Sequence, residues 1–118
     1  MSGPEAKLQR AIIDRLSYDR DVMVLRVNAG AMVLGEGKGR RMFRGAPAGT
    51  SDLLLCVRDQ WGAGFFCALE VKAKRGRLTD KQAAFQDRVR ELGGFACVVR
   101  SVDDAVAAVK RCKEGETE

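Results

Sequence analysis

Apolar residues recur along the chain with spacings that change from one segment to the next, and each spacing predicts a type of element. From Leu8 to Leu16 they recur every three or four positions, which is the spacing of one helix face. Helical spacing returns after Thr79 and again after Ser101. Continuous apolar runs of strand length lie between these helices, at 22–27, 53–57, 65–72 and 95–100. The pattern therefore predicts helices interspersed with strands.

Each predicted helix begins at a recognisable capping residue. Ser2 and Glu5 have the spacing of a capping box, with Ser2 as N-cap and Glu5 at the third helical position. Thr79 and Gln82 repeat this spacing, and Ser101 is the expected cap of the last helix. The first helix is expected to end near residue 18. The apolar faces expected to be buried are Phe85, Val89 and Leu92 in the middle helix and Val102, Ala105, Val106 and Val109 in the last.

The strands at 53–57 and 65–72 are separated by a polar segment that contains two glycines, which is typical of a hairpin. If the turn is centred near Trp61, antiparallel pairing sets Asp52 opposite Glu70. The segment from 71 to 100 is a strand-helix-strand unit, whose two strands are parallel if they are neighbours. We therefore expect a mixed sheet.

The predicted fold class is α/β, a mixed β-sheet flanked by helices in the order α-β-β-β-α-β-α. We expect a single domain over residues 1–118, because a domain of this length buries roughly 65% of its unfolded surface. The N-terminus lacks the apolar core of a signal peptide, and no apolar run approaches the about 20 residues of a membrane span. We therefore expect a cytoplasmic protein.

Two carboxylates and one ammonium converge at one end of this hairpin. Residues two apart on a strand project to the same face, so Glu70 and Lys72 point together, with Asp52 opposite, while Val71 points to the other face. A register slip of one residue would separate these side chains. Two neighbouring carboxylates suit a hard divalent cation such as Mg²⁺, and the matching reaction is phosphodiester hydrolysis. The alternative is an edge strand with a surface ion pair.

The charge of the chain favours a polyanionic partner. Lys and Arg number 21 against 16 Asp and Glu, a net charge of +5. The segments 31–34 and 41–44 flank a glycine-rich basic loop and predict a hairpin flap that lies on DNA. The basic residues form two clusters, which either face a phosphate backbone or are ordinary solvated loops. The first cluster is Lys38, Arg40, Arg41 and Arg44, and the second is Lys72, Lys74, Arg75 and Arg77.

Several other kinds of chemistry are excluded. The chain has no histidine, which removes serine and cysteine triads, histidine-ligated zinc and histidine-metal nucleases. The four cysteines show no C-x-x-C spacing and lie in apolar segments, so we expect buried, reduced thiols. The phosphate-cradling pattern G-x-x-x-x-G-K-[ST] is absent from the basic loop.

Four separated motifs together resemble one nuclease family. They are Gly49-Thr50-Ser51-Asp52, Glu70-Val71-Lys72, Leu78-Thr79-Asp80-Lys81-Gln82, and Gly93 with Val98-Val99-Arg100-Ser101. In order and spacing they are similar to the VRR-NUC branch of the PD-(D/E)XK nuclease superfamily. The resemblance implies a restriction-endonuclease-like core. Its small stand-alone members, from phages and bacteria, are homodimers that nick or cleave branched DNA such as Holliday junctions.

The resemblance also implies roles for individual residues. Asp52 and Glu70 would bind Mg²⁺ or Mn²⁺ together with the Val71 carbonyl, and Lys72 would activate or orient the attacking water. Glu5 would approach the metal from the first helix, and Gln82 would reach the site from the start of the next. For Glu5 and Gln82, a helix-capping role is the alternative.

The chain departs from the family pattern at two positions. Ser51 stands where proline is usual, and Ser101 stands where the second arginine of the family motif would be, which leaves Arg100 alone. Asn28 is a weaker site candidate that fits a turn, and Trp61 suits either base stacking or a dimer interface. Two rival functions stay open, a non-catalytic DNA-binding module of the same fold and an RNA-acting enzyme.

Overall fold

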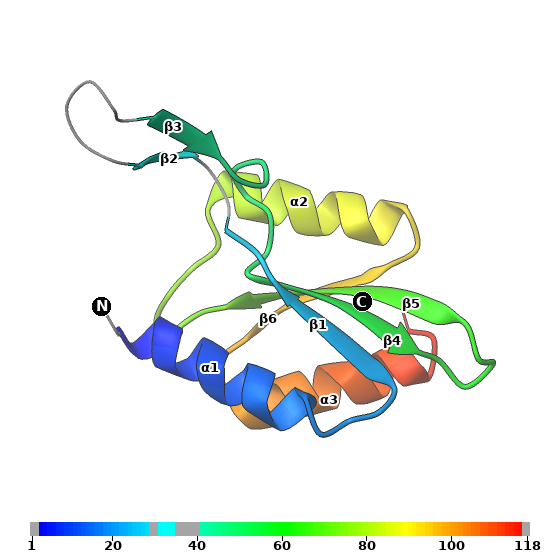
Figure 1. Ribbon diagram of the computed structural model, residues 1–118. Helices are drawn as coiled ribbons and strands as arrows, with labels where there is room; N and C mark the ends of the chain where they lie inside the picture. The colour runs from blue at the N-terminus through cyan, green and yellow to red at the C-terminus, as the bar shows by residue number, and fades with distance from the viewer. Residues whose placement is uncertain (1–2, 29–30, 35–40, 117–118) are drawn as a thin grey trace.

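The computed structural model describes residues 3–28, 31–34 and 41–116, with side chains described outside 29–44. Within these ranges the chain forms three helices and six strands (Figure 1). In chain order they are α1 (Pro4–Leu16), β1 (Val22–Arg26), β2 (Ala31–Leu34), β3 (Arg41–Arg44), β4 (Leu53–Arg58), β5 (Gly64–Val71), α2 (Asp80–Glu91), β6 (Phe95–Val99) and α3 (Val102–Lys113).

Four of the strands form one mixed sheet in the order β1-β4-β5-β6. Strands β1, β4 and β5 are antiparallel neighbours, whereas β6 runs parallel to β5 and is connected to it through α2. The α/β class, the mixed sheet and the core order α-β-β-β-α-β-α are therefore confirmed. The parallel pairing brings the carboxyl ends of β5 and β6 to the same edge of the sheet.

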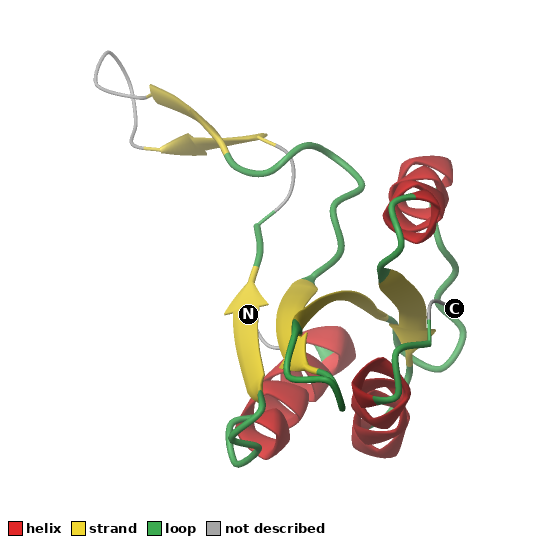
Figure 2. Cartoon of the chain, turned by 90° about the vertical axis from the view of Figure 1, so that its right-hand side faces the viewer, coloured by secondary structure: helices red, strands yellow, loops and turns green. Residues whose placement is uncertain are grey.

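The two faces of the sheet are covered unequally. Helices α1 and α3 lie on one face, and α2 lies on the other, where it contacts only β5 and β6 among the described elements (Figure 2). The main core lies between the sheet and α1 and α3, and a smaller cluster lies under α2. Fully buried residues of the main core include Ile12, Leu53, Val57, Leu69, Val71, Phe95 and Val99.

On the face of the sheet that carries α2, the part over β1 and β4 is not covered by this helix. This uncovered half of the sheet and its border at β5 carry exposed apolar side chains. Met23 and Leu25 on β1 are 57% and 52% exposed, and Phe66 on β5 is 45% exposed. Leu92, at the end of α2, is 69% exposed, so the prediction that it is buried is wrong. The reason is that Leu92 lines an open apolar cavity with Phe66, Phe85 and Val89, and no further described element covers it. Phe85, Val89 and the predicted face of α3 are at least partly buried, as expected.

Strands β2 and β3 form a separate antiparallel ribbon, with Met32 opposite Phe43 and Val33 opposite Met42. Among the described elements, these two strands contact only each other. The ribbon projects away from the four-stranded sheet (Figure 1). The predicted flap is thus present as a pair of strands, while its connecting loop, 35–40, lies outside the described residues.

The helix starts agree with the sequence in two cases out of three. Thr79 and Gln82 form the predicted capping box, and Ser101 accepts a hydrogen bond from the Asp104 amide as the cap of α3. At α1 the N-cap is Gly3 and no side chain caps it, so the predicted box of Ser2 and Glu5 is wrong. Pro4 occupies the first turn, where its fixed φ starts the helix without a capping side chain.

All four cysteines are free thiols, as expected for reduced residues. Cys67 and Cys112 are buried, and Cys97 is half-buried, but Cys56 is exposed because it faces the uncovered half of the sheet. Burial raises the pKa of Cys97 to about 11, and a hydrogen bond with Cys112, together with burial, raises the pKa of Cys67. Across the described residues, no helix is long and apolar enough to cross a membrane.

Candidate active site

The β4–β5 hairpin brings the two predicted carboxylates together. Leu53 pairs with Leu69, and one step further in this register Asp52 faces Glu70. Asp52 Oδ2 accepts a hydrogen bond of 2.8 Å from the Val71 amide, which ties the acid to the neighbouring strand. The register expected from a turn near Trp61 is therefore present.

A tight loop delivers Asp52 to the start of β4. Gly49 has φ +95, and a Cβ atom at this position would lie 2.5 Å from the Lys81 carbonyl oxygen at the start of α2. Only glycine combines this backbone angle with this approach. Ser51, which occupies the usual proline position, is buried, and the Asp52 carbonyl accepts from the Val27 amide at 2.8 Å. The loop is thus packed between β1 and α2.

Glu70 is a buried carboxylate with one oxygen partnered and one not. It is 2% exposed; Oε2 accepts from Gln82 Nε2 at 3.2 Å and lies 3.7 Å from Lys72 Nζ. Its Oε1 is buried and has no hydrogen-bond partner among the described residues. Such an atom is costly unless something binds it.

The surroundings of Glu70 favour its neutral form when no cation is bound. Burial, followed by the hydrogen bond that a protonated Glu70 carboxyl makes to Asp52 and then by the Asp52 charge, raises the pKa of Glu70 to about 8. The Lys72 ammonium acts in the opposite direction but does not offset burial. The long separation of 3.7 Å between Lys72 Nζ and Glu70 Oε2 agrees with a weak ion pair. A cation bound between the two acids would favour the ionised form of Glu70 instead.

Gln82 caps α2 and also contacts Glu70, while its role in catalysis stays a prediction. Its Oε1 accepts from the Thr79 amide at 2.9 Å, which completes the capping box of α2. Its Nε2 donates to Glu70. The amide therefore fixes the Glu70 carboxylate relative to the first turn of α2.

Glu5 contacts the loop that follows β5. Its Oε2 accepts from the Ala73 amide at 3.2 Å. A Cβ atom at Gly76 would lie 3.3 Å from Glu5 Oε2 and 3.2 Å from Lys72 Cδ, so the Gly76 backbone lies close to both side chains. Within the described residues, no three Asp, Glu or Cys side chains form a metal-binding group. The role of Glu5 as a metal ligand stays a prediction.

The chemistry of Asp52 and Glu70 fits a hard divalent cation. The pair offers carboxylate oxygens, which Mg²⁺ and Mn²⁺ prefer, and the buried Oε1 of Glu70 is available as a ligand. Two carboxylates so close need positive charge, and Lys72, whose side chain is 11% exposed, supplies only part of it. The Val71 carbonyl stays a predicted third ligand.

The predicted basic clusters divide between described and undescribed parts of the chain. Lys74, Arg75 and Arg77 lie in the loop after β5, around a cavity that Arg100 also lines. Ser101 leaves Arg100 without the second arginine of the family motif beside it in the chain. The parallel pairing of β5 with β6 is the signal that places it beside this loop. Of the flap cluster, Lys38 and Arg40 lie outside the described residues, and Arg41 and Arg44 are described only by their backbone in β3.

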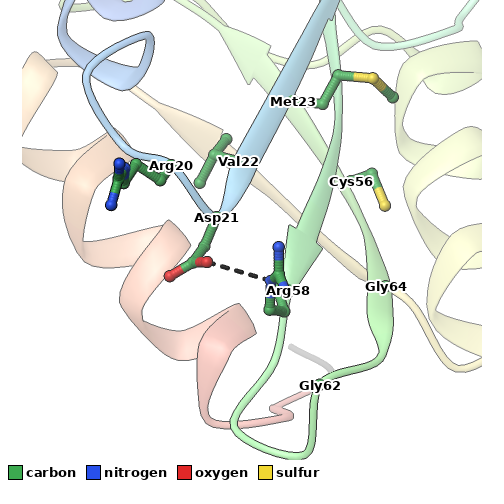
Figure 3. Close-up of a pocket in the computed structure, with 8 residues that line it drawn as sticks. All are labelled: Arg20, Asp21, Val22, Met23, Cys56, Arg58, Gly62 and Gly64. Carbon is green, nitrogen blue, oxygen red and sulfur yellow. Dashed lines mark ion pairs between the residues drawn. The ribbon is translucent and has the colours of Figure 1, made fainter.

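The opposite end of the hairpin holds a second cavity, which lacks a paired-acid site. Figure 3 shows its described lining residues, of which Asp21 alone carries a carboxylate and forms an ion pair of 3.2 Å with Arg58. Trp61, at the hairpin tip, is exposed and packs beside Gly115 after α3. The carbonyl of Asn28 accepts from the Ala46 amide at 2.9 Å, a contact with a segment 18 residues later, so the turn role of Asn28 stays a prediction.

Comparison with known proteins gives one match. A family model described as the VRR-NUC domain matches residues 3–103, which is most of the chain. That domain belongs to the PD-(D/E)XK nuclease superfamily. No curated protein and no solved structure matches the chain. The matched segment contains every residue placed at the site above, from Glu5 to Arg100.

Proposed function

The chain belongs to the VRR-NUC family of the PD-(D/E)XK nucleases, and on this premise we propose that it is a divalent-metal-dependent DNA endonuclease selective for branched DNA such as Holliday junctions. Membership implies a nuclease-type, DNA-processing function. The observation that carries the metal dependence is the meeting of Asp52 with a buried Glu70 whose Oε1 has no partner among the described residues.

Asp52 and Glu70, with the Val71 carbonyl, would hold Mg²⁺ or Mn²⁺. When bound, the ion would offset the two carboxylates and stabilise the negative charge that develops on the phosphodiester. Gln82 holds the Glu70 carboxylate in place through its side-chain amide. This positioning matters because small displacements of catalytic groups cost rate.

Lys72 would act on the attacking water and on the phosphate. Its side chain is almost fully buried beside Glu70, so it is held next to the carboxylates. From there it would orient the water and donate a hydrogen bond to a phosphate oxygen. In the reaction, the water oxygen forms a bond to phosphorus and gives up a proton to solvent, while the bond to the leaving sugar oxygen breaks and that oxygen takes up a proton from solvent.

The functional unit in this proposal is a homodimer, because symmetric cleavage of a four-way junction needs two sites. The uncovered half of the sheet supports it. Met23, Leu25 and Phe66 expose apolar surface on one face, and a patch of this kind is typical of an interface. A second copy is the occupant proposed for this face. The basic flap, residues 35–44, is proposed to lie on DNA.

The test uses labelled Holliday junction, fork, flap, single-stranded and linear duplex DNA, with Mg²⁺, with Mn²⁺ and with EDTA. Asp52→Asn and Lys72→Ala should abolish cleavage, while Asp103→Asn and Lys110→Ala, exposed residues of α3, serve as matched controls. Cleavage that survives either site substitution would overturn the site assignment.

The same panel tests the rival functions. Metal-independent binding of DNA without products would favour a non-catalytic DNA-binding module. Preferential cleavage of an RNA strand added to the panel would favour an RNA-acting enzyme. Equal cleavage of linear duplex and junction would contradict selectivity for branched DNA but leave the nuclease assignment intact.

A further inference from the structure

The loop from Lys72 to Thr79 separates the paired-acid site from the cavity that Arg75, Arg77 and Arg100 line. Its inner side faces the site, where the Gly76 backbone lies against Lys72 and Glu5. Its outer side lines an open cavity of about 700 Å³, which Val98 and Arg100 line from the end of β6. This cavity is large enough for a nucleotide unit, since ligand pockets typically measure roughly 300–1,000 Å³.

The lining of this cavity is cationic. It contains Lys74, Arg75, Arg77 and Arg100, and among the described residues no Asp or Glu lines it. Lys74, Arg75 and Arg77 make no ion pair or side-chain hydrogen bond with any described residue. Two acids lie near the lining, and both accept from backbone amides: Asp104 from Arg100 at 2.8 Å and Glu5 from Ala73 at 3.2 Å. Four positive side chains around a concavity without a carboxylate favour an anion with several acceptor oxygens.

The backbone of a single residue, Ala73, joins this cavity to the paired-acid site. The Ala73 amide donates to Glu5 Oε2 at 3.2 Å, and the Ala73 carbonyl accepts from Arg100 Nη1 at 2.8 Å. Gly76 then donates to the same carbonyl at 2.9 Å, which closes the turn. The position of the cationic wall is therefore set by the same residues that border the site.

We propose that this cavity is a phosphate-binding subsite, which holds a second phosphate group of the DNA strand whose scissile phosphate lies at Asp52 and Glu70. The inference rests on the proposed nuclease function and adds to it the side on which the strand continues, toward β6. Arg75 and Arg77 contact the phosphate, and Arg100 positions the loop through Ala73. The phosphate is either internal to the strand or at its end.

The first experiment measures binding without cleavage. Labelled junction DNA is titrated in EDTA with wild-type protein, with the double variant Arg75→Gln and Arg77→Gln, and with Arg20→Gln, an exposed arginine on the connection between α1 and β1. The double variant should bind about tenfold more weakly, and the slope of log K against log salt should be shallower by about one for each phosphate that it no longer neutralises. Arg20→Gln should change neither value. Unchanged affinity and salt dependence in the double variant would overturn the subsite.

The second experiment separates the two sources of the phosphate. Binding is compared for nicked and recessed duplexes that carry either a 5′-phosphate or a 5′-hydroxyl. If a terminal phosphate is bound, wild type prefers the phosphorylated end and the double variant loses this preference. If an internal phosphate is bound, wild type binds both ends equally and the double variant weakens both.

The binding titration does not depend on cleavage. The phosphate subsite and the nuclease assignment can therefore be contradicted independently of each other. A protein that binds as expected but yields no product with Mg²⁺ would keep the phosphate subsite and lose the nuclease assignment. A protein that cleaves junctions, with the double variant unchanged in binding, would keep the nuclease and lose the subsite. Thermal unfolding of each variant confirms that it is folded before binding is measured.

Discussion

Gln82 donates its side-chain amide to Glu70 across 3.2 Å while its own Oε1 caps the helix that follows. The first turn of α2 and the buried carboxylate on β5 are thus parts of one hydrogen-bonded unit. Any change that displaces the start of α2 displaces Glu70 as well. One side chain therefore both caps a helix and supports the proposed metal site.

Substitution at Gln82 should separate these two roles when it is compared with Thr79. Gln82→Ala removes the hydrogen bond to Glu70 and one half of the capping box, whereas Thr79→Ala removes only the other half of the box. Each should lower the free energy of unfolding by about 1 kcal/mol. Only Gln82→Ala should lower the single-turnover cleavage rate, by roughly tenfold. Equal cleavage rates for both variants would show that the hydrogen bond to Glu70 is incidental.

The raised pKa of Glu70 predicts a pH-dependent stability in EDTA. Between its ordinary value of 4.5 and the folded value of about 8, the folded state binds more protons than the unfolded state. The free energy of unfolding should therefore fall as the pH rises through this window. Glu70→Gln should remove that fall. In urea titrations, the free energy of unfolding of the variant should therefore rise relative to that of wild type from pH 5 to pH 8. A constant difference between the two proteins would contradict the assignment.

The loop before Asp52 should tolerate no side chain at Gly49. Gly62 provides the matched control, because its φ is +84 and nothing lies within 4 Å of a Cβ atom there. Gly62→Ala should lower the free energy of unfolding by about 1–2 kcal/mol, which is the penalty for a side chain at positive φ. Gly49→Ala should cost clearly more, because its Cβ would meet the Lys81 backbone, and it should also lower cleavage by moving Asp52. Equal unfolding free energies for the two variants would contradict the close approach.

The uncovered face of the sheet should govern self-association. Met23→Lys combined with Leu25→Lys should shift the protein from dimer to monomer in size-exclusion chromatography with light scattering. Tyr18→Lys, an exposed aromatic position after α1, is the control and should leave the dimer intact. A wild-type protein that is monomeric at micromolar concentration would argue against junction resolution by a dimer. A dimer that resists the double substitution would place the interface elsewhere.

The local features of the site follow from the amino-acid sequence. Asp52 and Glu70 face each other because the polar segment between the strands centres the turn near Trp61, and strand periodicity then fixes which side chains meet. The caps at Thr79 and Ser101 were equally predictable, since a cap depends on neighbours three residues away. The family resemblance, carried by four motifs, was confirmed by the family match.

The meeting of distant elements, in contrast, became visible only in the folded chain. The exposure of Leu92 and Cys56 depends on how far α2 extends over the sheet, and periodicity within one element does not carry that information. The same holds for Arg100, which reaches Ala73 only because β6 pairs in parallel with β5. Glu5, without the predicted cap at Ser2, bonds to a loop 68 residues away. Spacing along the chain determines contacts within a helix or hairpin, whereas contacts between separate elements depend on how they pack.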